Sequence, residues 1–207
     1  IPKFGFINVH ASLLPKLRGA APMQRSIINL DTETGISIMK IVEELDAGPI
    51  IQQDKIKINE NINYLVLSKL LSQIGAKSLI NSIKKIEKGE ENFKEQNHTE
   101  ATYAKKISKK EAEIKWNETA KNILAKINGL NPNPGAWFKY KNERYKVWKA
   151  KIVDGDGDFG KILDDELTVA CIEKSIKILE IQKEGKTKQL TDQFLLGNRI
   201  KKGESLA

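Results

Sequence analysis

Apolar and polar residues follow two rhythms in the first part of the chain. At residues 62–88 apolar side chains recur every three to five positions, which predicts a long amphipathic helix, and Gly89 is a typical residue to end it. Shorter apolar runs predict three strands and a short helix, the strands at 5–9, 36–42 and 50–58 and the helix at 22–30. Because helices and strands are interleaved, this part is predicted to have an α/β fold.

The pattern changes after Gly89. Residues 93–115 hold scattered apolar side chains and many charges, which predicts a linker that crosses the surface. The next helix is predicted at 117–128, with Asn117 as its N-cap and Gly129 at its end. We therefore expect three segments, a first domain at 1–92, the linker at 93–115 and a second domain at 116–207.

Short strand-like runs alternate with turns in the second domain. The apolar face shifts by one residue between Ile178 and Leu179, which predicts a β-bulge. A helix followed by several short strands predicts a small β-barrel. The predicted strands lie at residues 136–140, 144–153, 167–172 and 175–182.

Two polar side chains interrupt the first predicted strand. Asn8 and His10 are two residues apart, so both point to one face where the strand ends. In open α/β sheets ligands bind outside the carboxyl ends of the strands. A lone Asn or His there is more often a turn or capping residue, but two in register favour a functional site. Asp46 lies in another loop between strands, and we expect the two loops to meet.

Several motifs stand in a specific order along the chain. They include Asn-Val-His-Ala-Ser-Leu-Leu-Pro at 8–15 and Leu-Asp-Ala-Gly-Pro-Ile-Ile at 45–51, and the others lie at 18–25, 33–39, 101–107 and 131–136. In these motifs the chain resembles the folate-dependent formyltransferases, most closely the branch that formylates methionyl-tRNA. The resemblance implies a partial Rossmann-like catalytic domain, whose upstream part would precede residue 1, followed by an OB-like β-barrel that binds tRNA.

The chemistry that the resemblance implies is acyl transfer to an amine. Negative charge then grows on the formyl oxygen and a proton must leave the nitrogen, so the site needs a hydrogen-bond donor and a proton handler. Asn8 supplies an amide donor, and a carboxylate at Asp46 would fix the tautomer of His10 and favour its charged form. These three residues match the catalytic residues of the family.

The resemblance also implies two ligands. The donor is 10-formyltetrahydrofolate, expected near Ser12, Leu13, Leu14 and Pro15 and near the loop that contains Gly48. The acceptor is the amino group of initiator methionyl-tRNA, and the product serves translation initiation. Phosphates of its acceptor stem are expected to meet Lys16, Arg18 and Arg25, for which solvated loop charges are the competing interpretation.

Charge is unevenly distributed. The chain has 35 Lys and Arg against 27 Asp and Glu, a net charge of +8, and residues 93–207 carry +6 of it. A basic small barrel behind a catalytic domain is typical of a nucleic-acid partner, although a merely soluble surface can carry the same charge.

Other features limit the class of protein. No apolar run approaches the roughly 20 residues of a membrane span, so no membrane partner is expected. The single cysteine, Cys171, excludes an internal disulfide and fits a reducing compartment, so we expect a cytoplasmic protein of bacterial or organellar type. No metal is expected, because the acidic run at 154–158 has Phe159 where a calcium loop needs Gly.

Two alternatives stay open beside a monomeric methionyl-tRNA formyltransferase activity. One is a related formyltransferase that acts on a small amine such as glycinamide ribonucleotide. The other is a non-catalytic RNA-binding module attached to a decayed α/β remnant.

Overall fold

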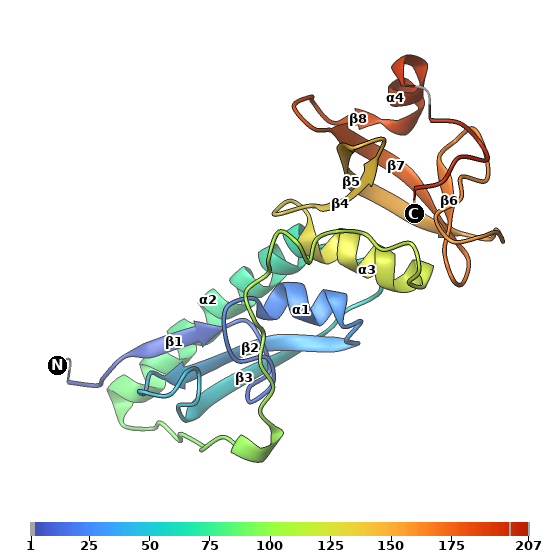
Figure 1. The fold of residues 1–207 in the computed structure, drawn as a ribbon. Helices are drawn as coiled ribbons and strands as arrows, with labels where there is room; N and C mark the ends of the chain where they lie inside the picture. Colours follow the sequence, from blue (N-terminus) through green and yellow to red (C-terminus); the bar gives the residue numbers. More distant parts are fainter. Residues whose placement is uncertain (1–2, 199, 207) are drawn as a thin grey trace. The chain divides into compact units, whose positions relative to one another are not determined.

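The computed structural model describes residues 3–198 and 200–206. Its contacts divide the chain into two compact units, which are described separately (Figure 1). The first unit comprises residues up to 27 together with 31–106, and the second comprises 28–30 together with 107 onward. Among the described residues, no helix is both long enough and apolar enough to cross a membrane.

The first unit is built on a three-stranded sheet in the order β1-β2-β3. Both strand pairs are antiparallel, so none of the named strands in this unit forms the parallel pair of a Rossmann-like sheet. The predicted elements are present with slightly different ends: β1 (Ile7–His10), α1 (Pro22–Ile28), β2 (Glu33–Lys40), β3 (Ile50–Lys57) and α2 (Tyr64–Lys88). A short 3₁₀ helix, η1 (His98–Glu100), follows.

Local chemistry sets the ends of α2. The side chain of Asn63 accepts a hydrogen bond from the backbone N–H of Val66, which satisfies a free donor of the first turn. Gly89 ends the helix at φ 70°, a left-handed conformation that glycine adopts without steric cost. The predicted helix and its glycine end are thus confirmed.

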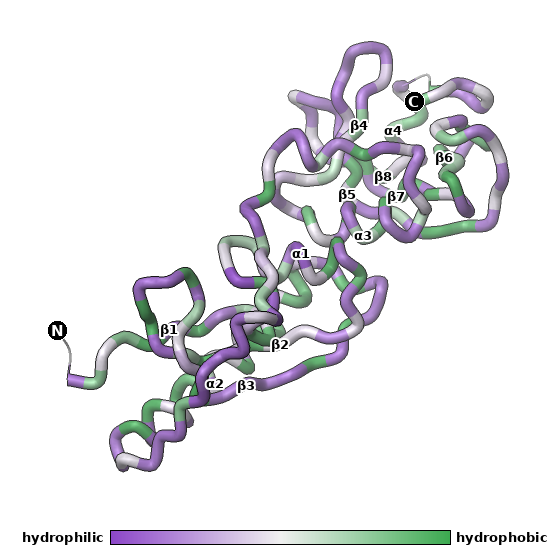
Figure 2. The backbone as a smooth tube through the Cα atoms, turned by 60° about the horizontal axis from the view of Figure 1, so that its bottom comes forward, coloured by the Kyte–Doolittle hydropathy of each residue, from purple (hydrophilic) through white to green (hydrophobic). Residues whose placement is uncertain are grey.

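One face of the sheet packs on α2, and its core contains Ile36, Ile38, Leu67 and Leu71. The outer strand β3 is largely hydrophilic, as the purple tube in Figure 2 shows. Since side chains alternate along a strand, this packing leaves the other face of the sheet for polar groups.

The segment expected to be a linker, residues 93–115, is divided between the units. Lys94 pairs with Ile50 through two backbone hydrogen bonds of 2.8 and 2.9 Å, and the N–H of Ala104 donates to the carbonyl of Arg18 at 2.7 Å. Gln96 is buried. The division therefore falls between 106 and 107, because backbone pairing and a buried amide hold a segment whose hydropathy predicts exposure.

The second unit is a helix followed by an antiparallel sheet in the order β4-β5-β7-β6, with β8 paired to β7. The predicted bulge is confirmed: Lys149 faces Glu180 and Ala150 faces Ile178, which leaves Leu179 unmatched. The elements are α3 (Ala120–Leu130), β4 (Ala136–Tyr140), β5 (Glu143–Val153), β6 (Thr168–Ala170), β7 (Ser175–Lys183), β8 (Gln189–Leu190) and α4 (Thr191–Gly197). The last two were not predicted, because both are short.

The predicted ends of α3 are wrong. Thr119, not Asn117, caps the helix by accepting a hydrogen bond from the N–H of Asn122 at 3.2 Å. Gly129 lies inside the helix, which continues because Leu130 is fully buried in an apolar contact.

An aromatic cluster fills the core of the second unit. Phe138 stacks on Tyr145 with ring centroids 5.6 Å apart, and Trp116 meets Phe138 edge-on at 5.7 Å. Cys171 is buried at the edge of this cluster, and burial raises the pKa of its thiol to about 11. Burial among apolar side chains makes this thiol a core residue and keeps it from the exposed setting that a nucleophile needs.

Candidate active site

The face of β1 that points away from α2 carries Asn8 and His10. In the register with β2, Asn8 faces Met39 and His10 faces Ser37. His10 is only 6% exposed, whereas Asn8 is half-buried. Among residues 3–198 and 200–206, none forms a hydrogen bond with the Asn8 amide, so its N–H groups are free to bind a ligand.

Both ring nitrogens of His10 face oxygen atoms. Nε2 lies 2.9 Å from the carbonyl oxygen of Leu17, and because a carbonyl only accepts, Nε2 is the donor. Nδ1 lies 3.6 Å from Oδ2 of Asp46, which is only 15% exposed. The two predicted loops therefore meet. Nδ1 is the nitrogen that can exchange a proton while the ring stays anchored by Nε2.

Asp46 is held by hydrogen bonds from distant parts of the chain. Its Oδ2 accepts a hydrogen bond from the N–H of Gly19 at 2.8 Å. The side chain of Gln96 donates to the carbonyls of Asp46 and Gly48, both at 2.8 Å. A Cβ at Gly48 would overlap the carbonyl oxygen of Lys40, so only glycine fits this loop. These contacts aim the carboxylate of Asp46 at His10.

Arg18 is part of the same scaffold. Its side chain is 1% exposed, and its Nε and Nη2 donate to Oε1 of Gln96 at 3.2 and 2.8 Å. Its Nη1 donates to Glu44 at 3.0 Å. The expected contact of Arg18 with tRNA phosphates does not fit this geometry, because the guanidinium is buried and its donors are used within the protein.

The loop after β1 is fixed by hydroxyl groups. Ser12 donates to the carbonyl of Lys16 at 2.6 Å, and Ser37 donates to the carbonyl of Ser12 at 2.7 Å. Leu14 is anchored by its N–H to Ser37 and by its carbonyl to Gln53. Ser12 is therefore a buried turn residue, and Leu13 and Pro15 are the half-buried apolar residues of this loop.

Comparisons with known proteins show which family this chain belongs to. The family described as "Formyl transferase" matches residues 1–83, and "Formyl transferase, C-terminal domain" matches residues 106–199. A methionyl-tRNA formyltransferase of Pelagibacter ubique is 50% identical over 207 residues, which cover all of this chain and 67% of that protein. One of Bradyrhizobium diazoefficiens is 39% identical, over 98% of this chain and 66% of that protein. The chain belongs to the methionyl-tRNA formyltransferase family.

The chain thus spans about two thirds of the length of these methionyl-tRNA formyltransferases. Solved structures share its fold. The methionyl-tRNA formyltransferase of Clostridium thermocellum is 23% identical and covers 75% of this chain, 69% of its own, with a TM-score of 0.58. HypX of Aquifex aeolicus, solved with tetrahydrofolic acid, is 15% identical and covers 96% of this chain, 36% of its own, with a TM-score of 0.75.

The remaining predicted residues of this family member lie around the same loops. Lys16 is exposed, and Arg25 is half-buried, with Nε and Nη2 donating to the carbonyl of Lys105 at 3.1 and 2.9 Å. Burial raises the pKa of the Asp31 carboxyl above its ordinary value, and the charge of Lys16 opposes this shift only in part. Within the described part of the chain, no cluster of His, Cys, Asp or Glu is large enough to hold a metal ion.

The sequence pattern did not identify Gln96, Ser37 or Gln53. Ser37 and Gln53 lie within strands, and Gln96 lies in a segment predicted to be exposed. Their contacts join residues far apart in the chain, such as Gln96 with Arg18, and hydropathy carries no signal for such pairs.

Proposed function

We propose that this chain carries the formyl-transfer centre of a methionyl-tRNA formyltransferase. The substrates are 10-formyltetrahydrofolate and the amino group of initiator methionyl-tRNA. The observation that supports this most directly is the free amide of Asn8 on the same face of β1 as the pair of His10 and Asp46. This is the donor and the proton handler that acyl transfer to an amine requires.

In this proposal the amine nitrogen attacks the formyl carbon, and the bond from that carbon to the folate nitrogen breaks. Asn8 donates to the formyl oxygen as charge develops on it. His10 takes the proton that leaves the amine through Nδ1, while Asp46 stabilises the charged imidazole. The leaving folate nitrogen gains one proton, so the transfer is balanced without an oxidant or a metal.

The folate is expected along the apolar loop formed by Leu13, Leu14 and Pro15 and beside Gly48. Ser12 contributes by shaping that loop, because its hydroxyl is engaged with Lys16. Lys16 and Arg25 are the basic side chains assigned to acceptor-stem phosphates, with Lys16 favoured by its exposure.

At the level of architecture, we infer a Rossmann-like catalytic domain to which β1-β2-β3 contributes an antiparallel portion. The second unit would be an OB-like barrel that binds tRNA, with the functional modules at 1–92 and 116–207. Its net positive charge supports an RNA partner. The proposed enzyme acts, when complete, as a cytoplasmic monomer.

Formyl transfer should be assayed on charged initiator tRNA, with the 207-residue chain and with a chimera that adds the third of the Pelagibacter ubique relative outside the matched span. Asn8→Ala should lower kcat by roughly a hundredfold or more, the usual cost of losing one oxyanion donor. Asp46→Asn should lower kcat and change its pH dependence. Unchanged kcat in both variants, at unchanged melting temperature, would refute the assignment.

A parallel assay with glycinamide ribonucleotide distinguishes the small-amine alternative. An N-formyltransferase of Helicobacter canadensis, solved with dTDP-3-aminofucose, and a sugar 3N-formyl transferase each share this fold with a TM-score of 0.66, so the fold alone does not choose the acceptor. Activity on the nucleotide and none on the tRNA would favour the alternative. RNA binding without transfer in the chimera would favour the non-catalytic one.

A further inference from the structure

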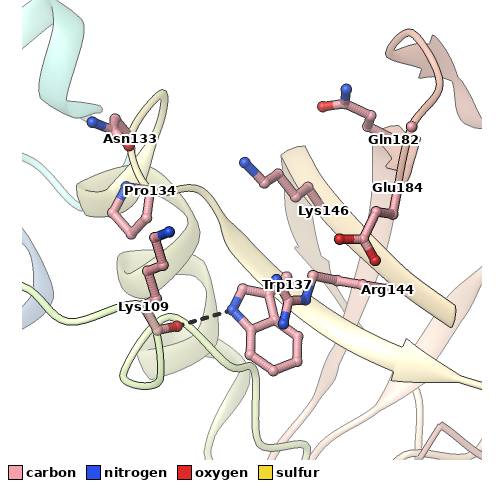
Figure 3. Close-up of a pocket in the computed structure, with 9 residues that line it drawn as sticks. Lys109, Asn133, Pro134, Trp137, Arg144, Lys146, Gln182 and Glu184 are labelled. Atoms are coloured by element: carbon pink, nitrogen blue, oxygen red, sulfur yellow. Dashed lines mark hydrogen bonds between the residues drawn. The ribbon is translucent and has the colours of Figure 1, made fainter. Parts of the chain in front are cut away.

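The second unit contains a cavity of about 340 Å³ beside β4, β5 and β7 (Figure 3). Trp137 of β4 forms part of its wall, and its indole N–H donates to the carbonyl of Lys109 at 3.1 Å. The charged side chains that line the cavity are Lys109, Arg144, Lys146 and Glu184.

Three of these four side chains are cationic, and they lack counter-ions. Within the described part of the chain, Lys109, Arg144 and Lys146 have no ion pair, and their side chains make no hydrogen bond. Some other lysines of this unit are neutralised: Lys126 lies 3.0 Å from Glu118 and Lys183 lies 2.8 Å from Glu143. Three cations without an ion pair therefore line one cavity, which Glu184 also lines.

Arg144 is the cation whose position at the cavity is fixed most clearly. Its guanidinium lies over the ring of Trp137, 4.3 Å from the ring centre, which holds the planar group in place. Its Nε is fully buried and has no acceptor among the described residues. A buried Nε cannot reach a ligand, but the two Nη groups also lack a hydrogen-bond partner among the described residues and are not buried, so they can donate to an anion in the cavity.

The chemistry of the lining selects the ligand. An arginine and two lysines around one cavity suit the oxygens of a phosphate, which accept several charged donors at once. Arg144 covers one face of Trp137, which is only 7% exposed, so the ring is not available to stack on a base. The cavity is at the lower limit of ligand pockets, which run from about 300 to 1,000 Å³. We propose that this cavity binds one phosphate group, of an RNA backbone or of a free phosphate compound.

An RNA backbone and a free phosphate compound offer the same phosphate oxygens and differ only in the rest of the molecule. Binding of an RNA phosphate rests on the proposed function, and the cavity would then hold one phosphodiester group of the substrate tRNA. Glu184 lies at the same cavity and opposes an anion, so removal of its charge should strengthen binding from either source. Removal of a positive charge should therefore weaken phosphate binding, and removal of the negative charge should strengthen it.

The test uses the full chain, an RNA duplex and inorganic phosphate as probes. Lys146→Gln should weaken RNA binding roughly five- to tenfold at 0.1 M salt and reduce the salt slope by about one, the signature of one phosphate contact. Arg144→Gln should act similarly, and Glu184→Gln should strengthen binding. Lys151→Gln is the matched control, since Lys151 is exposed on the same strand and does not line the cavity.

Inorganic phosphate separates the sources. If it binds with the same dependence on Lys146 and Glu184 while RNA binding ignores both, the cavity serves a free phosphate compound. If Lys146→Gln and Arg144→Gln change neither probe more than Lys151→Gln does, the proposal is overturned. Formyl transfer by the same preparations reports on the proposed function independently, and melting temperatures verify that each variant is folded.

Discussion

Replacement of Gln96 by leucine tests whether the segment after α2 holds the candidate active site together. Gln96 is 6% exposed and makes four hydrogen bonds, two donated to the carbonyls of Asp46 and Gly48 and two accepted from Arg18. Leucine has a similar volume, so the cavity stays filled while all four bonds are lost.

The expected loss of stability follows from the kinds of hydrogen bond that Gln96→Leu removes. A neutral hydrogen bond contributes about 0.5–1.5 kcal/mol and one that involves a charged group about 1.5–3 kcal/mol. Two bonds to carbonyls and one acceptor atom facing the Arg18 guanidinium therefore give about 2.5–6 kcal/mol. For a unit of this size, 1 kcal/mol corresponds to about 4–8 °C, so the first unit should melt more than ~10 °C lower.

The two units can be observed separately. All three tryptophans, Trp116, Trp137 and Trp148, lie in the second unit, so their fluorescence follows that unit alone. Far-UV circular dichroism is weighted toward α2, the longest helix of the first unit. Gln96→Leu should lower the melting temperature by dichroism and leave the tryptophan transition in place.

Gln96→Glu is the matched variant. A carboxylate still accepts from Arg18 but loses both N–H donors and places an oxygen against the carbonyls of Asp46 and Gly48. Its stability loss should be smaller than that of Gln96→Leu, while the His10 imidazole signal in NMR should shift, because the Asp46 loop moves. The reasoning fails if Gln96→Leu melts within about 2 °C of the parent chain.

Three further outcomes are expected. In the assayed enzyme, neutral replacement of both His10 and Asp46 should lower kcat much less than the product of the two single losses. Multiplicative losses in kcat would mean that the two residues act independently. The exposed Phe6 flanks β1, which is paired on one side only among the described strands. The chain should therefore self-associate through this edge, and sedimentation velocity should show less association for Phe6→Lys. A hydrogen bond from Tyr140 is the main cause that lowers the pKa of Glu204 to about 2. Its stabilising effect is therefore present above the ordinary pKa of a glutamate and lost as pH falls toward 2, and Glu204→Gln should flatten that part of the stability profile measured by tryptophan fluorescence.

Much of the secondary structure follows from the sequence pattern. The apolar repeat at 62–88 and its glycine end predict α2, because burying one face of a helix requires that spacing. The one-residue shift at Leu179 predicts the bulge, because side chains on a strand alternate between faces. The pairing of Asn8 with His10 on one face follows from the same alternation.

Only the tertiary structure decided what surrounds those residues. Arg18 looks like a solvated loop charge in sequence, yet it is buried against Gln96, which lies 78 residues away. A buried polar side chain is stable only when its partners are in place, and those partners come from loops that the fold brings together. Hydropathy measures the average cost of burying a residue type, so it predicts the core but not a satisfied polar network such as the one that aims Asp46 at His10.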